Sequence, residues 1–164
     1  MKWLTNWYRS VVKAKNKNYE YEEVVVTLKD VKRAMLAWEH DMPEQMIRTQ
    51  LLREDQSIDL YRLRRYLGGI SNQKFYMSRF TYQIFEEQDK HIPRYLDMVQ
   101  AAVDDYMDEN TQLPVVNGTR NRQVHYDKLI QGHYLNELPN IPLYVTTEEF
   151  LLTHDSDWHQ SYVN

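Results

Sequence analysis

Five arginines between positions 48 and 65 form the densest group of side chains in this sequence that could bind a ligand. They are interleaved with tyrosines, in the order Arg48, Arg53, Tyr61, Arg62, Arg64, Arg65 and Tyr66. Arginine beside aromatic rings can bind nucleic acid or another anion, because the guanidinium group donates hydrogen bonds in a planar fork and also stacks on rings. The alternative is surface charge paired with Glu54, Asp55 and Asp59, and the sequence favours this alternative.

The sequence lacks the common catalytic and metal-binding patterns. Its four glycines do not form a phosphate-cradling loop, and it has no cysteine for a thiolate nucleophile or a disulfide. The segment HDSDWH at 154–159 has the ligand types for a divalent cation, but a solvated chain end is the favoured interpretation. The acidic runs at 86–89 and 104–109 favour solvated helix faces over acid–base chemistry. We therefore predict no catalytic residues, no metal site and no cofactor.

The first 18 residues differ from the rest of the chain. Their apolar side chains recur at the spacing of one helix face, the other positions include several cations, and the first acidic residue is Glu20. A basic helix with tryptophans on its apolar face is typical of helices that lie at an anionic membrane surface. The alternative is that the same face docks on the domain or on another protein. The residues of this predicted helix face are Lys2, Trp3, Leu4, Trp7, Tyr8, Arg9, Val11, Val12 and Lys13.

The composition is that of one folded domain. Of 164 residues, 42% are hydrophobic and 27% are charged, which is too apolar for a disordered chain. The net charge of −4 argues against nucleic acid as a general partner. Because no apolar run is long enough to span a membrane and no secretory signal is evident, we expect a cytoplasmic protein, associated with the membrane if residues 1–18 bind it.

The chain beyond these residues contains two related segments that are offset by 68 positions. The clearest match aligns 66–85 with 134–153, where two tyrosines, a leucine and an asparagine recur at the same places. Upstream, the apolar positions of one helix face in 28–38 match those in 96–106. Agreement of apolar register over so long a stretch indicates a duplication.

The duplication predicts an α+β fold of two tandem related halves packed with pseudo-twofold symmetry. We expect a single domain over 19–156, with half-repeats at about 24–88 and 92–156 and a flexible tail at 157–164. Neither half has enough apolar surface to fold alone. The two long helices should therefore cover one small sheet formed by strands of both halves.

Each half is expected to contain a long helix, a loop, a short helix and a strand. Thr27 should cap the first long helix in a capping box with Asp30, and the second should begin at Pro93 and end near Asn110. Gly68 should end the first short helix. The other expected elements are extended segments near 46–52 and 115–116, short helices at about 58–67 and 127–135, strands at 75–77 and 143–145, a helix at 79–88, and a helix or strand at 148–153.

Two segments of the sequence resemble known families. FYMSRFTYQIFEE at 75–87 and IPLYVTTEEFLLTH at 141–154 resemble an uncharacterised protein family of Bacillus-type Gram-positive bacteria, which implies a bacterial protein and no particular activity. AAVDDYMDENTQLP at 101–114 and DKLIQGHYLNELPNIP at 127–142 are similar to the globular part of pseudopilins. The chain lacks their long apolar N-terminal helix, so this likeness concerns the local fold and implies no pilus role.

These observations favour a non-enzymatic binding or structural protein, held at the inner membrane surface if residues 1–18 bind lipid. The first alternative is a nucleic-acid or anion-binding module that uses the arginine and tyrosine residues described above. The second is an enzyme with a cleft between the halves, because a site assembled from scattered residues leaves no motif. The sequence does not identify a ligand, a protein partner or an oligomeric state.

Overall fold

The computed structural model describes residues 21–162, so the basic segment at 1–18 lies outside it. Helices and small antiparallel sheets make up the fold, which agrees with the predicted α+β class. The first long helix, α2 (Leu28–Asp41), begins after Thr27, whose hydroxyl accepts from the Asp30 amide while the Asp30 carboxylate accepts from the Thr27 amide. The predicted capping box is therefore confirmed.

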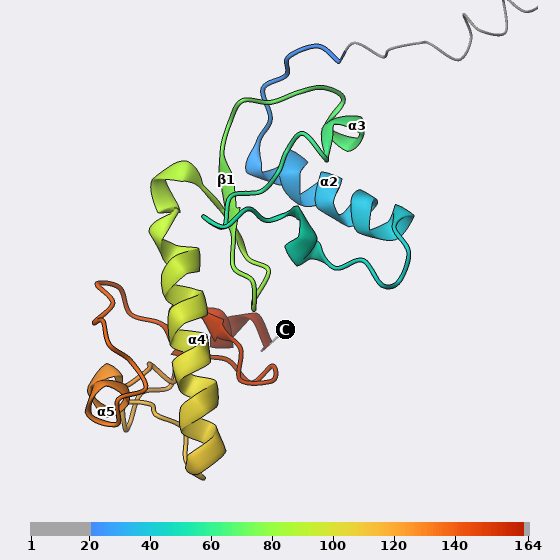
Figure 1. The fold of residues 1–164 in the computed structure, drawn as a ribbon. Helices are drawn as coiled ribbons and strands as arrows, with labels where there is room; N and C mark the ends of the chain where they lie inside the picture. Colours follow the sequence, from blue (N-terminus) through green and yellow to red (C-terminus); the bar gives the residue numbers. More distant parts are fainter. Residues whose placement is uncertain (1–20, 163–164) are drawn as a thin grey trace, which may run out of the picture.

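The second long helix, α4 (His91–Glu109), crosses the molecule beside the β1 hairpin, with α2 on the other side of that hairpin (Figure 1). It starts before the predicted Pro93, because the 3-10 helix η2 (Glu87–Asp89) leads directly into it. The helix faces predicted to be buried are correct: Val31, Ala34, Met35, Trp38, Leu96, Val99, Ala102 and Val103 are buried, and Leu28 and Tyr106 are partly buried.

Two separate sheets replace the single sheet that we expected both halves to share. β1 (Phe75–Met77) pairs antiparallel with β2 (Ile84–Glu86), and β3 (Tyr144–Val145) pairs antiparallel with β4 (Leu152–Thr153). Isolated bridges join Tyr76 to Ser57 and Tyr144 to Gln123, so each pair of strands contacts a bridged segment that precedes it in the chain. Each two-stranded sheet thus pairs strands that are neighbours in the chain, because closing a short hairpin costs less chain entropy than pairing distant strands. A parallel bridge between Glu23 and Ile70 joins segments that lie farther apart in the sequence.

The helix expected at 79–88 is wrong, because the chain turns back there and forms β2. The Ser78 amide donates to the Gln83 carbonyl at 3.0 Å, and the Tyr82 amide donates to the Ser78 carbonyl at 3.1 Å. Tyr82 has a φ of 58°, in the left-handed region, which ends any helix. At 148–153 the strand alternative is correct, since β4 follows a turn in which Phe150 also has a φ of 58°.

The short elements are smaller than predicted. α3 (Arg64–Leu67) begins late, because the chain before it bonds to β1, and Gly68 ends it with a φ of 77° as expected. α5 (Tyr126–Gln131) ends ahead of His133, which has a left-handed φ of 61°. The segment expected to be extended near 46–52 contains the 3-10 helix η1 (Arg48–Leu51).

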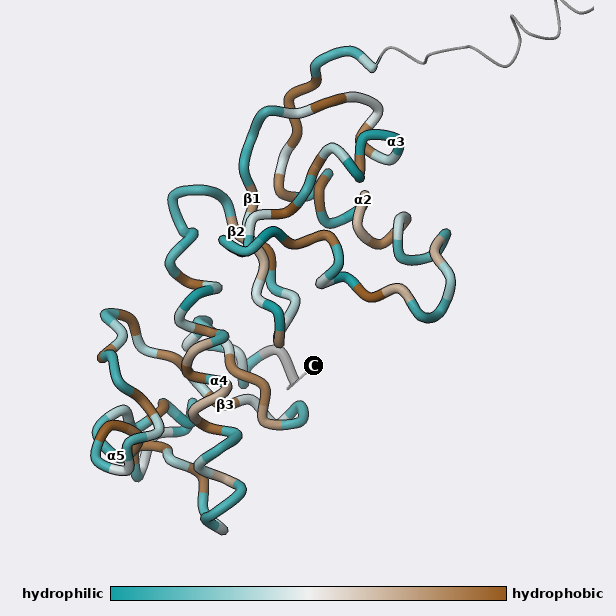
Figure 2. The backbone as a smooth tube through the Cα atoms, viewed as in Figure 1, coloured by the Kyte–Doolittle hydropathy of each residue, from teal (hydrophilic) through white to brown (hydrophobic). Residues whose placement is uncertain are grey.

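The described residues bury two hydrophobic cores, one around α2 and β1 and the other around α4, α5, β3 and β4. Figure 2 shows apolar segments in both parts of the chain. Phe75 and Met77 of β1 belong to the first core, whereas Phe85 of β2 belongs to the second. The β1–β2 hairpin therefore joins the two cores, while pseudo-twofold packing stays a prediction.

The tail predicted from 157 is part of the fold as far as the structure describes it. Residues 158–162 form the 3-10 helix η3 (Trp158–Tyr162). Trp158 is buried, and its indole N–H donates to the Asn121 carbonyl at 2.8 Å. Burial of this large ring fixes the start of η3 against the domain, while a flexible tail over 157–164 as a whole stays a prediction.

Candidate functional site

Asp97 in α4 holds the loop that joins β1 to β2. Its carboxylate accepts hydrogen bonds from the Ser78 hydroxyl at 2.6 Å, the Arg79 amide at 3.0 Å and the Gln56 side chain at 2.5 Å. Gln56 also donates to the Pro93 carbonyl at 3.2 Å. Through these bonds α4 is tied to two loops that precede it in the chain.

Gln100, one turn further along α4, holds the hairpin of β3 and β4 in a similar way. Its side chain is 2% exposed, and its carbonyl oxygen accepts from the Leu152 amide at 2.9 Å. Its amide nitrogen donates to the Asp104 carboxylate at 3.0 Å and to the Phe150 carbonyl at 3.4 Å. Adjacent turns of α4 thus fix the positions of both hairpins.

A cavity of about 710 Å³, here named the α4 cavity, lies between the start of α4, the turn at 54–56 and the β1–β2 loop. Acidic residues reach it from the turn at 54–55, and basic residues reach it from the first turn of α4. Two hydrogen bonds from Ser57 hold the pKa of Asp55 below its usual value. The side chains that line the cavity are Glu54, Asp55, Gln56, Tyr76, Arg79, Lys90, His91, Arg94 and Asp97.

A second cavity of about 500 Å³, here named the α2 cavity, lies between α2 and the end of β4. Its walls combine apolar and polar side chains from both parts of the chain. Tyr82 lines it in the left-handed conformation, and the Arg48 guanidinium lies 5.4 Å from the centre of the Tyr82 ring. Glu39 holds that guanidinium by a hydrogen-bonded ion pair of 2.7 Å. The residues that line this cavity are Lys32, Met35, Leu36, Arg48, Tyr82, Gln83, Ile84, Phe85, Thr153, His154 and Asp155.

His154 joins the two parts of the chain at the edge of the α2 cavity. Its ring meets Phe85 edge-on at 5.0 Å, and its Nδ1 lies 3.4 Å from the Gln83 side-chain oxygen. The same glutamine donates to the Thr153 hydroxyl at 3.3 Å. Burial lowers the pKa of His154 below its usual value, so the fold favours the neutral imidazole.

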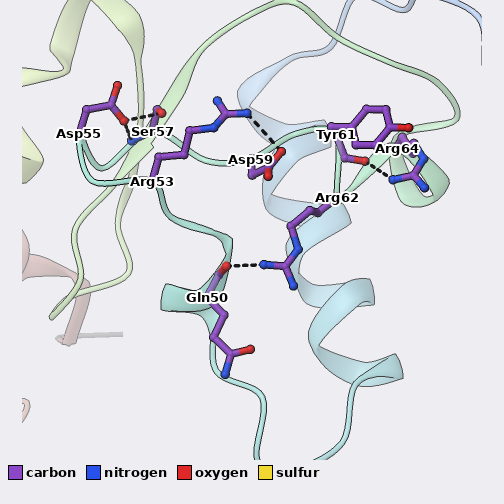
Figure 3. A network of polar contacts seen from close by, with 8 residues as sticks. All are labelled: Gln50, Arg53, Asp55, Ser57, Asp59, Tyr61, Arg62 and Arg64. Carbon is purple, nitrogen blue, oxygen red and sulfur yellow. Dashed lines mark hydrogen bonds and ion pairs between the residues drawn. The ribbon is translucent and has the colours of Figure 1, made fainter.

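The arginine and tyrosine group identified in the sequence is held by contacts within the protein. Figure 3 shows Arg53 paired with Asp59, Arg62 donating to the Gln50 carbonyl, and Arg64 donating to the Tyr61 carbonyl. The remaining two arginines have different partners. Arg48 contacts Glu39 and Tyr82, and Arg65 lies 5.9 Å from the centre of the Tyr66 ring.

Each arginine of the group therefore has a contact within the protein. Anion binding by these arginines stays a prediction. Sequence reasoning missed Asp97, Gln100 and Tyr82. Among the described residues, no three His, Asp or Glu side chains are placed to hold a metal ion together.

Comparison with protein-family models assigns the chain to a family. Residues 21–154 match a family described as protein of unknown function (DUF3939). The chain belongs to the DUF3939 family. The match confirms the resemblance to an uncharacterised family, while the bacterial range and the pseudopilin likeness stay predictions. No curated protein matches this DUF3939 chain, and no solved structure does.

Proposed function

We propose that this DUF3939 protein is a non-enzymatic binding protein made of two related halves, and that the α2 cavity at their junction holds its ligand. Matched hydrogen bonds support the relation of the halves. Ser78 donates to Gln83 at 3.0 Å, and Thr146, 68 positions later, donates to Leu151 at 2.9 Å. Tyr82 and Phe150, also 68 positions apart, share a φ of 58°. We extend the proposal to the predicted halves at about 24–88 and 92–156.

The conformation of Tyr82 is the observation that carries the binding proposal. A left-handed φ strains a residue that has a bulky side chain, and such strain is kept where the surrounding structure fixes the residue for a purpose. Here Arg48 lies over the ring, and the strained residue forms part of a cavity wall. The volume lies within the usual range of small-molecule sites.

The lining side chains indicate the kind of ligand. Met35, Leu36 and Ile84 offer apolar surface for an apolar body. The charged side chains are two cations, Lys32 and Arg48, against one carboxylate, Asp155. Because Glu39 already neutralises Arg48, Lys32 is the cation available to an acidic head group. The proposed ligand is therefore a small molecule with an apolar body and an acidic group.

The dye 8-anilinonaphthalene-1-sulfonate has this chemistry and fluoresces strongly in apolar surroundings. We expect the folded protein to bind it, and Lys32→Gln to weaken binding about fivefold, since a partly exposed ion pair contributes up to about 1 kcal/mol. Tyr82→Gly should also weaken binding, because it removes a wall while tolerating the same φ. Lys29→Gln, on the same helix but outside the cavity, is the matched control.

Near-ultraviolet circular dichroism should confirm that each variant is folded, because the dye also binds loosely packed states. Binding that is absent, or that is equal in the Lys32, Tyr82 and Lys29 variants, would show that the α2 cavity is not the site. An enzyme would use the same junction, so turnover of a bound acid would favour the enzymatic alternative over simple binding.

A second proposed role is attachment to the cytoplasmic membrane surface through residues 1–18. The sequence pattern supports it, since five cations with no acid near an anionic bilayer can contribute about 1 kcal/mol each. Within residues 21–162 no helix has the length and apolarity to cross a bilayer. The full chain should sediment with anionic vesicles at low salt, and a folded chain starting at Tyr19 should not. Vesicle binding by neither protein, or by both equally, would contradict this role.

A further inference from the structure

Acidic and basic side chains from different segments of the chain line the α4 cavity. Glu54 and Asp55 reach it from the turn at 53–57, and Lys90 and His91 reach it from the start of α4. These four side chains are exposed, and among the described residues Glu54 and Lys90 form no ion pair with one another. The cavity therefore has an acidic wall and a basic wall, and on the acidic wall Asp55 already accepts two hydrogen bonds from Ser57 through one of its oxygens.

Three further charged groups in this cavity already have partners within the protein, and one is Arg79, whose guanidinium donates to the Arg53 carbonyl at 3.0 Å. Asp97 accepts hydrogen bonds from Gln56, Ser78 and the Arg79 amide. The Arg94 guanidinium donates to both carboxylate oxygens of Glu137, and these hydrogen bonds lower the pKa of that carboxyl group. A ligand would thus find its partners among Glu54, Asp55, Lys90 and His91.

Hydrogen bonds fix the distance between the two walls. Gln56, next to Asp55 in the turn, donates to the Pro93 carbonyl at 3.2 Å and to Asp97 at 2.5 Å, both in α4. Arg79 donates to the Arg53 carbonyl at 3.0 Å, which ties the β1–β2 loop to the same turn. Gln56 bonds in this way from a left-handed φ of 65°, a strained conformation for a residue with a side chain. Charges held apart by a braced frame are preorganised for a molecule that bridges them.

We propose that the α4 cavity binds a small amino-acid-like zwitterion, with its ammonium group towards Glu54 and Asp55 and its carboxylate towards Lys90 and His91. The volume of about 710 Å³ accommodates a ligand of this size and is lined on one side by the buried ring of Tyr76. The site is separate from the α2 cavity and shares no lining residue with it.

Calorimetric titration with matched probes tests the proposal. Glycine, 4-aminobutyrate and 6-aminohexanoate carry both charges at three separations, whereas the corresponding simple acids and simple amines carry one charge. We expect at least one zwitterion to bind about tenfold more tightly than the acid and the amine of its own length. If every zwitterion binds no better than its singly charged analogues, or with a Kd above the order of 10 mM, the proposal is wrong.

Variants assign each wall to its charge. Glu54→Gln should weaken binding of the zwitterion severalfold and leave binding of the simple acid unchanged. Lys90→Gln should also weaken binding of the zwitterion severalfold, but it should leave binding of the simple amine unchanged. Glu44→Gln and Lys29→Gln, which are exposed and outside both cavities, are the controls. Equal effects of the cavity and control variants would overturn the proposal. The Lys32→Gln variant should bind the zwitterion normally, so failure of one site is distinguishable from failure of the other.

Discussion

Truncation of Asp97 should destabilise the protein strongly, because one carboxylate fixes both the turn at 53–57 and the β1–β2 loop. Asp97→Ala removes hydrogen bonds from Gln56, Ser78 and the Arg79 amide. A hydrogen bond to a charged group contributes about 1.5–3 kcal/mol, so three would sum to about 4.5–9 kcal/mol if they were independent. They share one acceptor at a half-buried position, where water can replace part of the loss, and their contributions are therefore not additive.

We expect Asp97→Ala to lower the free energy of unfolding by about 3 kcal/mol and Asp97→Asn by about half as much, since the amide keeps one acceptor oxygen. At this chain length the alanine variant should melt about 6–12 °C below the wild type. Urea denaturation followed by tryptophan fluorescence measures the difference. Asp105→Ala, an exposed change on the same helix, should stay within about 0.5 kcal/mol of the wild type. A loss as small as that for Asp97→Ala would refute the interpretation that Asp97 braces the junction.

Three other changes test separate features. Trp38→Ala should cost about 3–5 kcal/mol in urea denaturation, because the indole is 3% exposed in the first core, and a loss below about 0.5 kcal/mol would contradict this packing. Gly69→Ala should cost about 1–3 kcal/mol in the same assay, because the added Cβ would lie 2.5 Å from the Glu22 carbonyl oxygen. Unchanged stability would show that residues 22–24 move to accommodate the methyl group. Burial lowers the pKa of His154 from 6.5, so the unfolded chain binds the proton more readily and stability should fall as the pH drops through about 6.5 towards the folded pKa. His154→Gln should show a smaller decline in a pH series of thermal melts, and an unchanged decline would exclude His154 as the cause.

The elements that the sequence predicted well depend on local pattern. The spacing of apolar residues located α2 and α4 with their buried faces, and Thr27 with Asp30 identified a helix start from side-chain chemistry alone. β1 was predicted at its observed bounds, because a short apolar strand between polar turns gives a clear signal. These features need information only from neighbours in the sequence.

The parts that failed depend on contacts between distant residues. The segment 79–88 has a helical composition, but Asp97 binds Ser78 and Arg79 and so keeps the chain in a turn. The lining of neither cavity was predicted, because each combines side chains from segments that are far apart in the sequence. The arginine group was located correctly in the sequence, yet carbonyl groups, carboxylates and rings within the protein occupy its guanidinium groups. Charge density along the chain does not reveal whether a cation already has a partner.

The tandem order of the proposed halves explains why the α4 cavity occurs at their junction. Gln56 and Arg122 occupy the same place in their hairpins, with φ of 65° and 54°, and their carbonyls accept from Met77 and Val145 at 3.1 and 3.0 Å. The Gln56 side chain reaches the helix that follows its half, whereas the Arg122 guanidinium lies 5.8 Å from the centre of the Phe150 ring. Between β4 and Tyr162 the chain forms no second long helix, so Arg122 meets no counterpart of Asp97 there. The cavity needs both a turn from one proposed half and the long helix of the half that follows it. Two halves in tandem provide this combination once.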